Sequence, residues 1–74
     1  MQIGLFFGSF NPIHIGHLAL ANYIVENSAL QQIWFVVSPQ NPFKDKKYLL
    51  NENLRYDLVY ETIKNDERFG VSNI

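Results

Sequence analysis

The sequence contains no cysteine, so neither a disulfide framework nor a cysteine-based zinc site can form. It also lacks an excess of basic residues, because six lysines and arginines are outnumbered by seven acidic residues. Nucleic-acid binders gain much of their affinity from cations placed on phosphates, so no nucleic-acid partner is expected. No apolar run approaches the roughly 20 residues of a membrane span, and no signal peptide is visible. We therefore expect a cytoplasmic protein without a membrane partner.

A length of 74 residues corresponds to one small domain or to part of a larger one. Apolar residues make up 47% and charged residues 18% of the chain, which is typical of a globular rather than a disordered protein. We expect residues 1–74 to form a single domain.

Apolar and amphipathic segments alternate in the order strand, helix, strand, helix, strand. Continuous apolar runs at 3–10 and 33–37 predict strands covered on both faces, and a third strand is predicted at 68–74. Helical spacing predicts helices at 17–27 and after the N-cap Asn51. The buried positions expected on these helices are Leu18, Ala21, Ile24 and Val25, then Leu54, Leu58, Val59 and Ile63. Such alternation predicts an α/β fold with parallel strands and ligand binding at their carboxyl ends.

The decapeptide GSFNPIHIGH, residues 8–17, occupies the first of these strand ends. Gly8 has no Cβ, so a ligand could approach the backbone closely there. His14 and His17 are expected at the start of the helix, on one face, with Gly16 between them. Free N–H groups and the helix dipole favour an anion at such a terminus, and imidazoles donate to phosphoryl oxygens or take up charge near neutral pH. The decapeptide predicts a cradle for a reacting phosphate.

Other interpretations of the two histidines are a helix cap, a surface position or a metal site. A metal site would need a third ligand, and none is evident nearby. Neither common phosphate loop is present, because the glycines do not fit G-x-G-x-x-G and no Gly-Lys-Ser/Thr follows.

These ten residues resemble the G-[ST]-F-[DN]-P-x-H-x-G-H signature of the nucleotidyltransferase superfamily, whose HIGH element also occurs in class I aminoacyl-tRNA synthetases. The resemblance implies a Rossmann-like nucleotidyltransferase fold, of which the chain would supply the N-terminal β-α-β-α-β half. It assigns catalysis to His14 and His17. It implies ATP-phosphate contacts for Gly8, Ser9, Phe10, His14, Gly16 and His17.

A second stretch, IWFVVSPQNPFK followed by NLRYDLVYETI, is similar to bacterial nicotinate-nucleotide adenylyltransferases. Pro42 and Lys44 match the loop that these enzymes carry after the second strand, and Arg55 matches an arginine that opens the next helix. The resemblance therefore places Lys44 and Arg55 at the acceptor's phosphate. Phe43 and Asn41 depart from the family, which often has histidine and proline there. An ordinary solvated loop lysine and a surface helix arginine are the alternatives.

Trp34 lies inside the second apolar run, so a position in the core is favoured over a platform for a ligand.

The resemblance implies adenylyl transfer from ATP to nicotinate mononucleotide, with Mg²⁺ as cofactor held mainly by substrate oxygens and water. No protein metal ligands are assigned. A related adenylyltransferase acting on phosphopantetheine or nicotinamide mononucleotide stays an alternative, as does a nucleotide-binding module without turnover.

The match covers only the N-terminal part of that family's chain, and no Ser/Thr-rich second signature with its arginine follows. We expect a domain truncated on its C-terminal side that is inactive alone. In the family's strand order, 3-2-1-4-5, the first strand would then be a bare apolar edge, which favours self-association.

Overall fold

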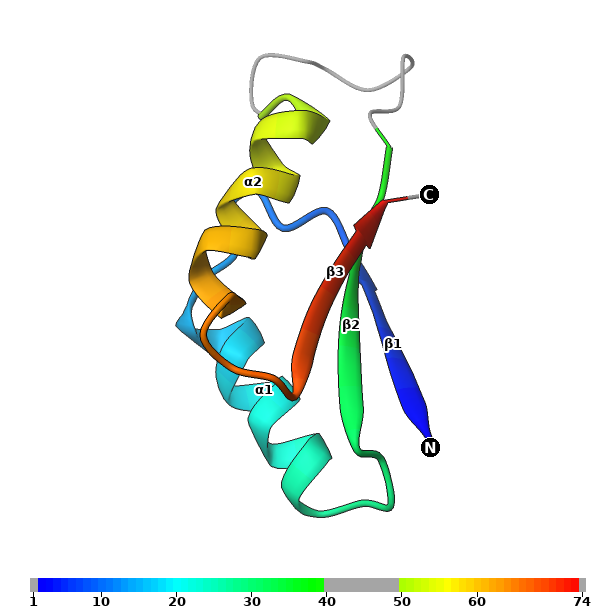
Figure 1. Cartoon of the computed structure of the whole chain (residues 1–74). Helices are drawn as coiled ribbons and strands as arrows, with labels where there is room; N and C mark the ends of the chain where they lie inside the picture. Colours follow the sequence, from blue (N-terminus) through cyan, green and yellow to red (C-terminus); the bar gives the residue numbers. More distant parts are fainter. Residues whose placement is uncertain (1, 40–49, 74) are drawn as a thin grey trace.

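The computed structural model describes residues 2–39 and 50–73. Its elements follow the predicted order: β1 (Ile3–Gly8), α1 (Ile15–Glu26), β2 (Gln32–Val37), α2 (Glu52–Ile63) and β3 (Phe69–Asn73) (Figure 1). Each helix has 12 residues, and among the described residues neither helix is long and apolar enough to cross a membrane. Two boundaries differ from prediction by two residues, since β1 ends at Gly8 rather than residue 10 and α1 begins at Ile15 rather than residue 17.

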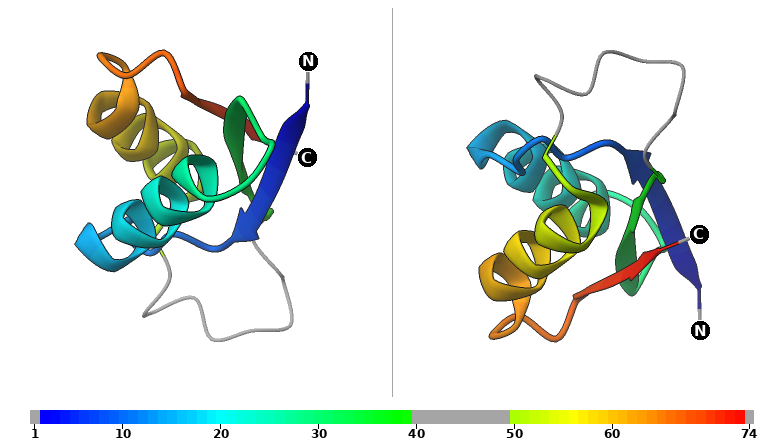
Figure 2. Two further views of the ribbon diagram at one scale, coloured as in Figure 1. Left: turned by 90° about the horizontal axis from the view of Figure 1, so that it is seen from below. Right: turned by 90° about the horizontal axis from the view of Figure 1, so that it is seen from above.

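The three strands form a parallel sheet in the order β1-β2-β3. Both helices lie on the same face of this sheet, as Figure 1 and both views of Figure 2 show. Right-handed crossovers explain this arrangement, because two successive crossovers in the same direction place both helices on one side.

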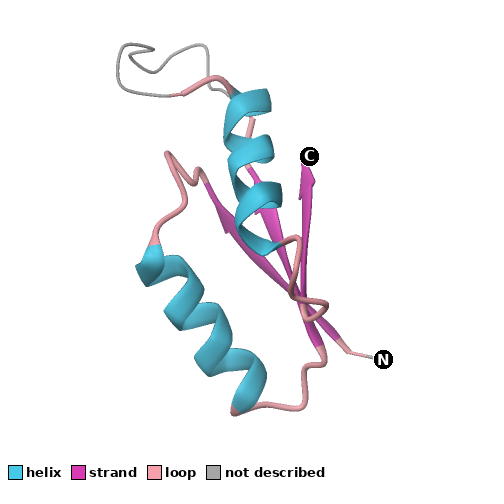
Figure 3. Ribbon diagram, turned by 60° about the vertical axis from the view of Figure 1, so that its left-hand side comes forward, coloured by secondary structure: helices cyan, strands magenta, loops and turns pink. Residues whose placement is uncertain are grey.

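The pairing register brings the carboxyl ends of the strands together. Gly8 lies opposite Val37, and Val37 lies opposite Asn73. Ser38 donates from both its main-chain N and its Oγ to the Gly8 carbonyl, at 3.0 and 3.2 Å. The decapeptide leaves the sheet at this edge and leads into the start of α1 (Figure 3).

The core lies between the helices and the sheet, and its centre is aromatic. Phe35 of β2 is fully buried, with ring centroids 5.4 Å from both Phe6 and Phe10 and 5.8 Å from Phe69. The predicted buried positions of α1 are confirmed: Ala21 and Val25 are buried, and Leu18 and Ile24 pack partly buried against the core.

The buried face of α2 differs from the prediction. It consists of Arg55, Val59 and Ile63, which are spaced by four residues, whereas Leu54 is exposed. Residues four apart share one face of a helix. At the N-terminal end of α2 the buried position is therefore Arg55 and not the expected Leu54. Val59 and Ile63 are buried as expected.

The expectation that the strands are covered on both faces is wrong within the described residues. Leu5 and Phe7 of β1 are 61% and 59% exposed, and Trp34 is 36% exposed rather than part of the core. The reason is the one-sided placement of the helices, which leaves the opposite face of the sheet open. The Trp34 indole lies over Gly70, where an added Cβ would come within 2.7 Å of the ring.

Two phenylalanines on opposite faces of the sheet provide a matched test of this one-sided core. Phe35→Ala should lower the free energy of unfolding by about 3–5 kcal/mol, the usual loss for a buried phenylalanine. Phe7→Ala removes the same atoms from an exposed position and should lower it by less than about 1 kcal/mol. Urea unfolding followed by circular dichroism at low protein concentration measures both. Equal losses would contradict the one-sided core.

Candidate phosphate-binding site

Two histidines cap the start of α1 by bonding to the main chain. His14 is the N-cap residue, and its Nδ1 accepts a hydrogen bond from Gly16 N at 3.0 Å. In return, His17 Nδ1 accepts from His14 N, also at 3.0 Å. This exchange is the arrangement of a capping box, with imidazoles in place of the usual hydroxyl and carboxylate. The cap interpretation of the histidines and a role toward a ligand are therefore compatible.

The cap determines the tautomer of both rings. A neutral imidazole carries its proton on one nitrogen and accepts on the other. Because both Nδ1 atoms accept main-chain N–H groups, the proton of each neutral ring is on Nε2. Each ring therefore has an Nε2–H group left to donate to a ligand, while protonation at Nδ1 would break the cap.

The two rings lie against each other and against the aromatic core. Their centroids are 3.8 Å apart, with planes inclined by 35°. The His17 ring also meets Phe10 edge-on, with centroids 5.0 Å apart. Burial lowers the pKa of His17, and repulsion from His14 lowers it further. Near neutral pH the structure thus favours an uncharged His17 that acts as a hydrogen-bond donor.

The helix terminus offers fewer free N–H groups than the sequence suggested. Gly16 N donates to His14 Nδ1, and His17 N donates to the His14 carbonyl at 3.0 Å. The Gly16 N–H, expected at a phosphate, is thus already engaged. The need for glycine there is steric instead, because an added Cβ would lie 2.8 Å from Cε1 of the His14 ring.

Gly8 and Phe10 also have structural roles that differ from the expected one. An added Cβ at Gly8 would meet the Phe10 ring at 3.0–3.3 Å, so this ring fills the space where a side chain would lie. Phe10 is 1% exposed and has a φ of 48°, the left-handed region that non-glycine residues rarely adopt. Burial of its ring among Phe6 and Phe35 holds the chain in this conformation. Ser9, next to it, is exposed.

A surface position was one of the two interpretations of Arg55, and the structure contradicts it. It is 0% exposed, and its Nη1 donates to the Ser9 carbonyl at 2.7 Å. Nε donates to the Leu50 carbonyl at 2.8 Å. As placed, Arg55 has no exposed atom with which to reach an acceptor phosphate, and it holds the decapeptide from the core side. Lys44, Pro42, Phe43 and Asn41 lie outside the described residues.

Sequence reasoning missed two side chains that support the site. Asn11 Oδ1 accepts from Leu50 N at 2.8 Å, and Ser38 bonds the Gly8 carbonyl. The burial of Arg55 had a signal in the sequence, because it precedes Val59 and Ile63 at intervals of four.

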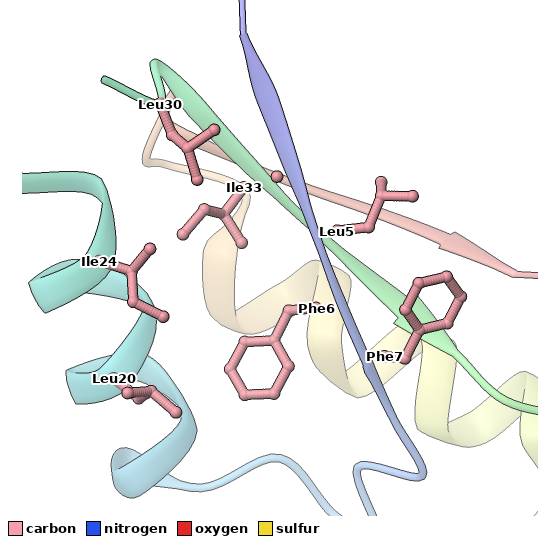
Figure 4. A pocket seen from close by; sticks show the side chains of 8 residues that line it. Leu5, Phe6, Phe7, Leu20, Ile24, Leu30 and Ile33 are labelled. Atoms are coloured by element: carbon pink, nitrogen blue, oxygen red, sulfur yellow. The ribbon is translucent and has the colours of Figure 1, made fainter. Parts of the chain in front are cut away.

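Neither a cluster of metal-ligating side chains nor a polar pocket marks another site in the described part of the chain. No group of three or more histidine, aspartate or glutamate side chains is placed there to hold a metal ion. An apolar pocket of about 300 Å³ opens between β1 and α1 (Figure 4). Its lining residues are Gly4, Leu5, Phe6, Phe7, Leu20, Ile24, Leu30 and Ile33. None of these residues has a charged or hydrogen-bonding side chain that could hold a phosphate.

Known proteins resemble the chain in sequence and in fold. It is 54% identical over all 74 residues to a probable nicotinate-nucleotide adenylyltransferase of Cytophaga hutchinsonii, and 55% identical to one of Porphyromonas gingivalis. The chain spans 38% of the length of each. The solved structure of Plasmodium falciparum nicotinic acid mononucleotide adenylyltransferase complexed with NaAD matches 97% of this chain and 36% of its own. The TM-score of 0.77 at 21% identity supports the Rossmann-like nucleotidyltransferase fold.

The model of the cytidylyltransferase-like family matches residues 5–74, which include the whole decapeptide and all of α2. This chain therefore belongs to the cytidylyltransferase-like family.

Proposed function

We propose that this chain forms the triphosphate-binding part of an enzyme that transfers the adenylyl group of ATP to nicotinate mononucleotide. The observation that carries the proposal is the pair of capped histidines, whose Nε2–H groups are available side by side at the carboxyl end of the sheet. The names of the relatives support the choice of reaction, and the family supports the choice of a nucleotide substrate. We expect the reaction in the cytoplasm.

In the proposed site, His14 and His17 donate from Nε2 to the α-phosphate and the leaving pyrophosphate. The main chain at Gly8, Ser9 and Phe10 borders the triphosphate, and Gly16 contributes by leaving room for the His14 ring. Donors that are fixed before the ligand binds stabilise developing charge without reorganisation. The capping bond from His14 N and the contact with Phe10 supply this fixation for His17, and the capping bond from Gly16 N supplies it for His14.

The reaction needs no nucleophile from the protein. A phosphate oxygen of the mononucleotide forms a new bond to the α-phosphorus, and the bond from this phosphorus to the bridging oxygen breaks to release pyrophosphate. The attacking monoester is largely ionised at neutral pH, since its second pKa is about 6. Mg²⁺ enters as part of the substrate MgATP, held by phosphate oxygens and water. The protein's contribution is alignment and electrostatic stabilisation.

The test measures pyrophosphate release in a full-length protein, meaning one of the relatives' length with these 74 residues at its N-terminus. With MgATP, nicotinate mononucleotide should support turnover far better than nicotinamide mononucleotide or phosphopantetheine. His17→Ala should lower kcat by about 10²–10³, the loss typical of one charge-stabilising donor. Tyr23→Ala, at an exposed position of the same helix, is the control and should leave kcat unchanged.

Lys44→Ala, in the stretch that matches the acceptor loop, should raise KM for the mononucleotide more than KM for ATP. ATP binding without dinucleotide formation from any acceptor would contradict the proposed function.

The lowered pKa of His17 predicts how stability depends on pH. The folded state binds this proton less tightly than the unfolded state, in which the pKa is about 6.5. The contribution of His17 is therefore fully present above about pH 6.5 and is lost as the pH falls through the folded-state value. Asp66, whose pKa is lowered by hydrogen bonding to Arg68, titrates in a more acidic range.

Ring-carbon NMR should give His17 a pKa below 6.5 in the folded chain. Urea unfolding at pH 7.5 and 5.5 should show a loss of stability that is smaller in His17→Gln. An unchanged or raised pKa of His17 would contradict the capped geometry.

We further propose that copies of the 74-residue chain associate through β1. Among the described residues this strand pairs only with β2, and its outward side chains include the exposed Leu5 and Phe7. Unpaired apolar edges tend to pair with another chain. Sedimentation velocity should show a mass that rises with concentration, and Phe7→Lys should shift the chain toward monomer. A wild-type chain that stays monomeric over the same concentrations would refute this association.

A further inference from the structure

We propose that Arg55 is a positioning residue of the phosphate site: it fixes the main chain at Ser9 and adds positive charge to the site from the core side. The inference rests on the proposed function, because it takes the ligand of the decapeptide to be a triphosphate. It differs from a direct contact with the acceptor's phosphate, because the side chain has no exposed atom.

The guanidinium of Arg55 joins two segments that are far apart in sequence. Nη1 donates to the Ser9 carbonyl at 2.7 Å, and Nε donates to the Leu50 carbonyl at 2.8 Å. Asn11 strengthens the same junction, because its Oδ1 accepts from Leu50 N at 2.8 Å. The decapeptide is thus held to the start of α2 by two hydrogen bonds, one accepted by Ser9 and one accepted by Asn11.

The bond to Ser9 also determines the direction of the next N–H group. The Ser9–Phe10 peptide is trans, so its carbonyl and its N–H point in opposite directions within one plane. With the carbonyl held toward the buried guanidinium, the Phe10 N–H points away from Arg55. Phe10 follows the end of β1, and its ring contacts the His17 ring. The Phe10 N–H therefore lies at the same end of the sheet as the imidazole donors.

The charge of Arg55 lacks a carboxylate partner within the described part of the chain. The ion pairs there involve Lys64 and Arg68, and Nη2 of Arg55 is buried without a hydrogen-bond partner. A buried charge is costly unless it is compensated, so such residues commonly face a charged partner. A triphosphate bound on the decapeptide would provide that compensation, since the field of a buried cation is only weakly screened.

The experiment uses the full-length protein defined above, with Arg55→Met, Arg55→Lys and a control, Arg68→Met. Arg68 lies at the opposite end of the fold in a network with Asp66, Asn22 and Glu26. Calorimetry measures ATP dissociation, and steady-state kinetics measure kcat and both KM values. Arg55→Met should weaken ATP binding by at least about tenfold and lower kcat by about 10²-fold, as misplacement of a site can do. KM for the mononucleotide should change little.

Arg55→Lys keeps the charge but cannot hold both carbonyls with a fixed fork. It should therefore recover most of the ATP affinity, while kcat stays reduced; Arg68→Met should match the unsubstituted protein. Unchanged ATP binding and kcat in folded Arg55→Met would overturn the proposal, as would an increase confined to KM for the mononucleotide. If circular dichroism shows Arg55→Met unfolded, Arg55→Lys decides, and an unaltered kcat there overturns the proposal.

The unsubstituted protein tests the proposed function separately from the role of Arg55. An unsubstituted protein that binds ATP but forms no dinucleotide overturns the proposed function, and weakened ATP binding in Arg55→Met then still supports Arg55 as a positioning residue. An unsubstituted protein that does not bind ATP overturns both.

Discussion

The hydrogen bonds that two imidazole rings accept from the main chain determine what the start of α1 can offer to a ligand. Through these bonds, His14 and His17 engage N–H groups that would otherwise be free at the helix terminus. In exchange, both rings are left with an Nε2–H donor in a fixed orientation. An anion bound in the proposed site would therefore meet side-chain donors rather than the bare end of a helix. Both histidines and the glycine between them therefore form one structural unit.

Contacts from the sheet, from Phe10 and from α2 hold the segment that leads into this cap. The parallel register brings Gly8, Val37 and Asn73 to one edge, where Ser38 fixes the Gly8 carbonyl. Phe10 anchors the turn by burying its ring against β1 and β2 despite an unfavourable φ. Arg55 reaches the same turn from α2. Strained backbone that the surrounding packing maintains is commonly found at functional sites, where the strain is part of preorganisation.

The order of the elements and the position of the decapeptide between a strand and a helix followed from the sequence. Apolar runs indicated the strands, and the decapeptide indicated the strand-to-helix junction with His14 at its start. The helix capping could not be foreseen in this form, because imidazoles are unusual capping groups and the tautomer depends on geometry. The steric roles of Gly8 and Gly16 could not be foreseen for a related reason. Each leaves room for a specific ring, Phe10 or His14, that only the folded chain brings there.

Arg55 and Trp34 show a second limit. For Arg55 the alternative to a ligand contact was a surface position, and Trp34 was expected in the core; the structure buries Arg55 and leaves Trp34 36% exposed. For Trp34 the cause is topological, since the two crossovers place both helices on one face. For Arg55 the spacing from Val59 and Ile63 carried the information, although an arginine is rarely expected on a buried face.

The tautomeric state of the two imidazoles tests the central claim most directly. Long-range nitrogen–proton NMR of the chain at a pH above 7, with and without tripolyphosphate, distinguishes the protonated from the bare nitrogen of each ring. We predict a bare Nδ1 and a protonated Nε2 in both His14 and His17, with the Nε2–H signals shifting when the anion is added. A proton on Nδ1 of either ring, or Nε2–H signals that do not respond to the anion, would contradict the account.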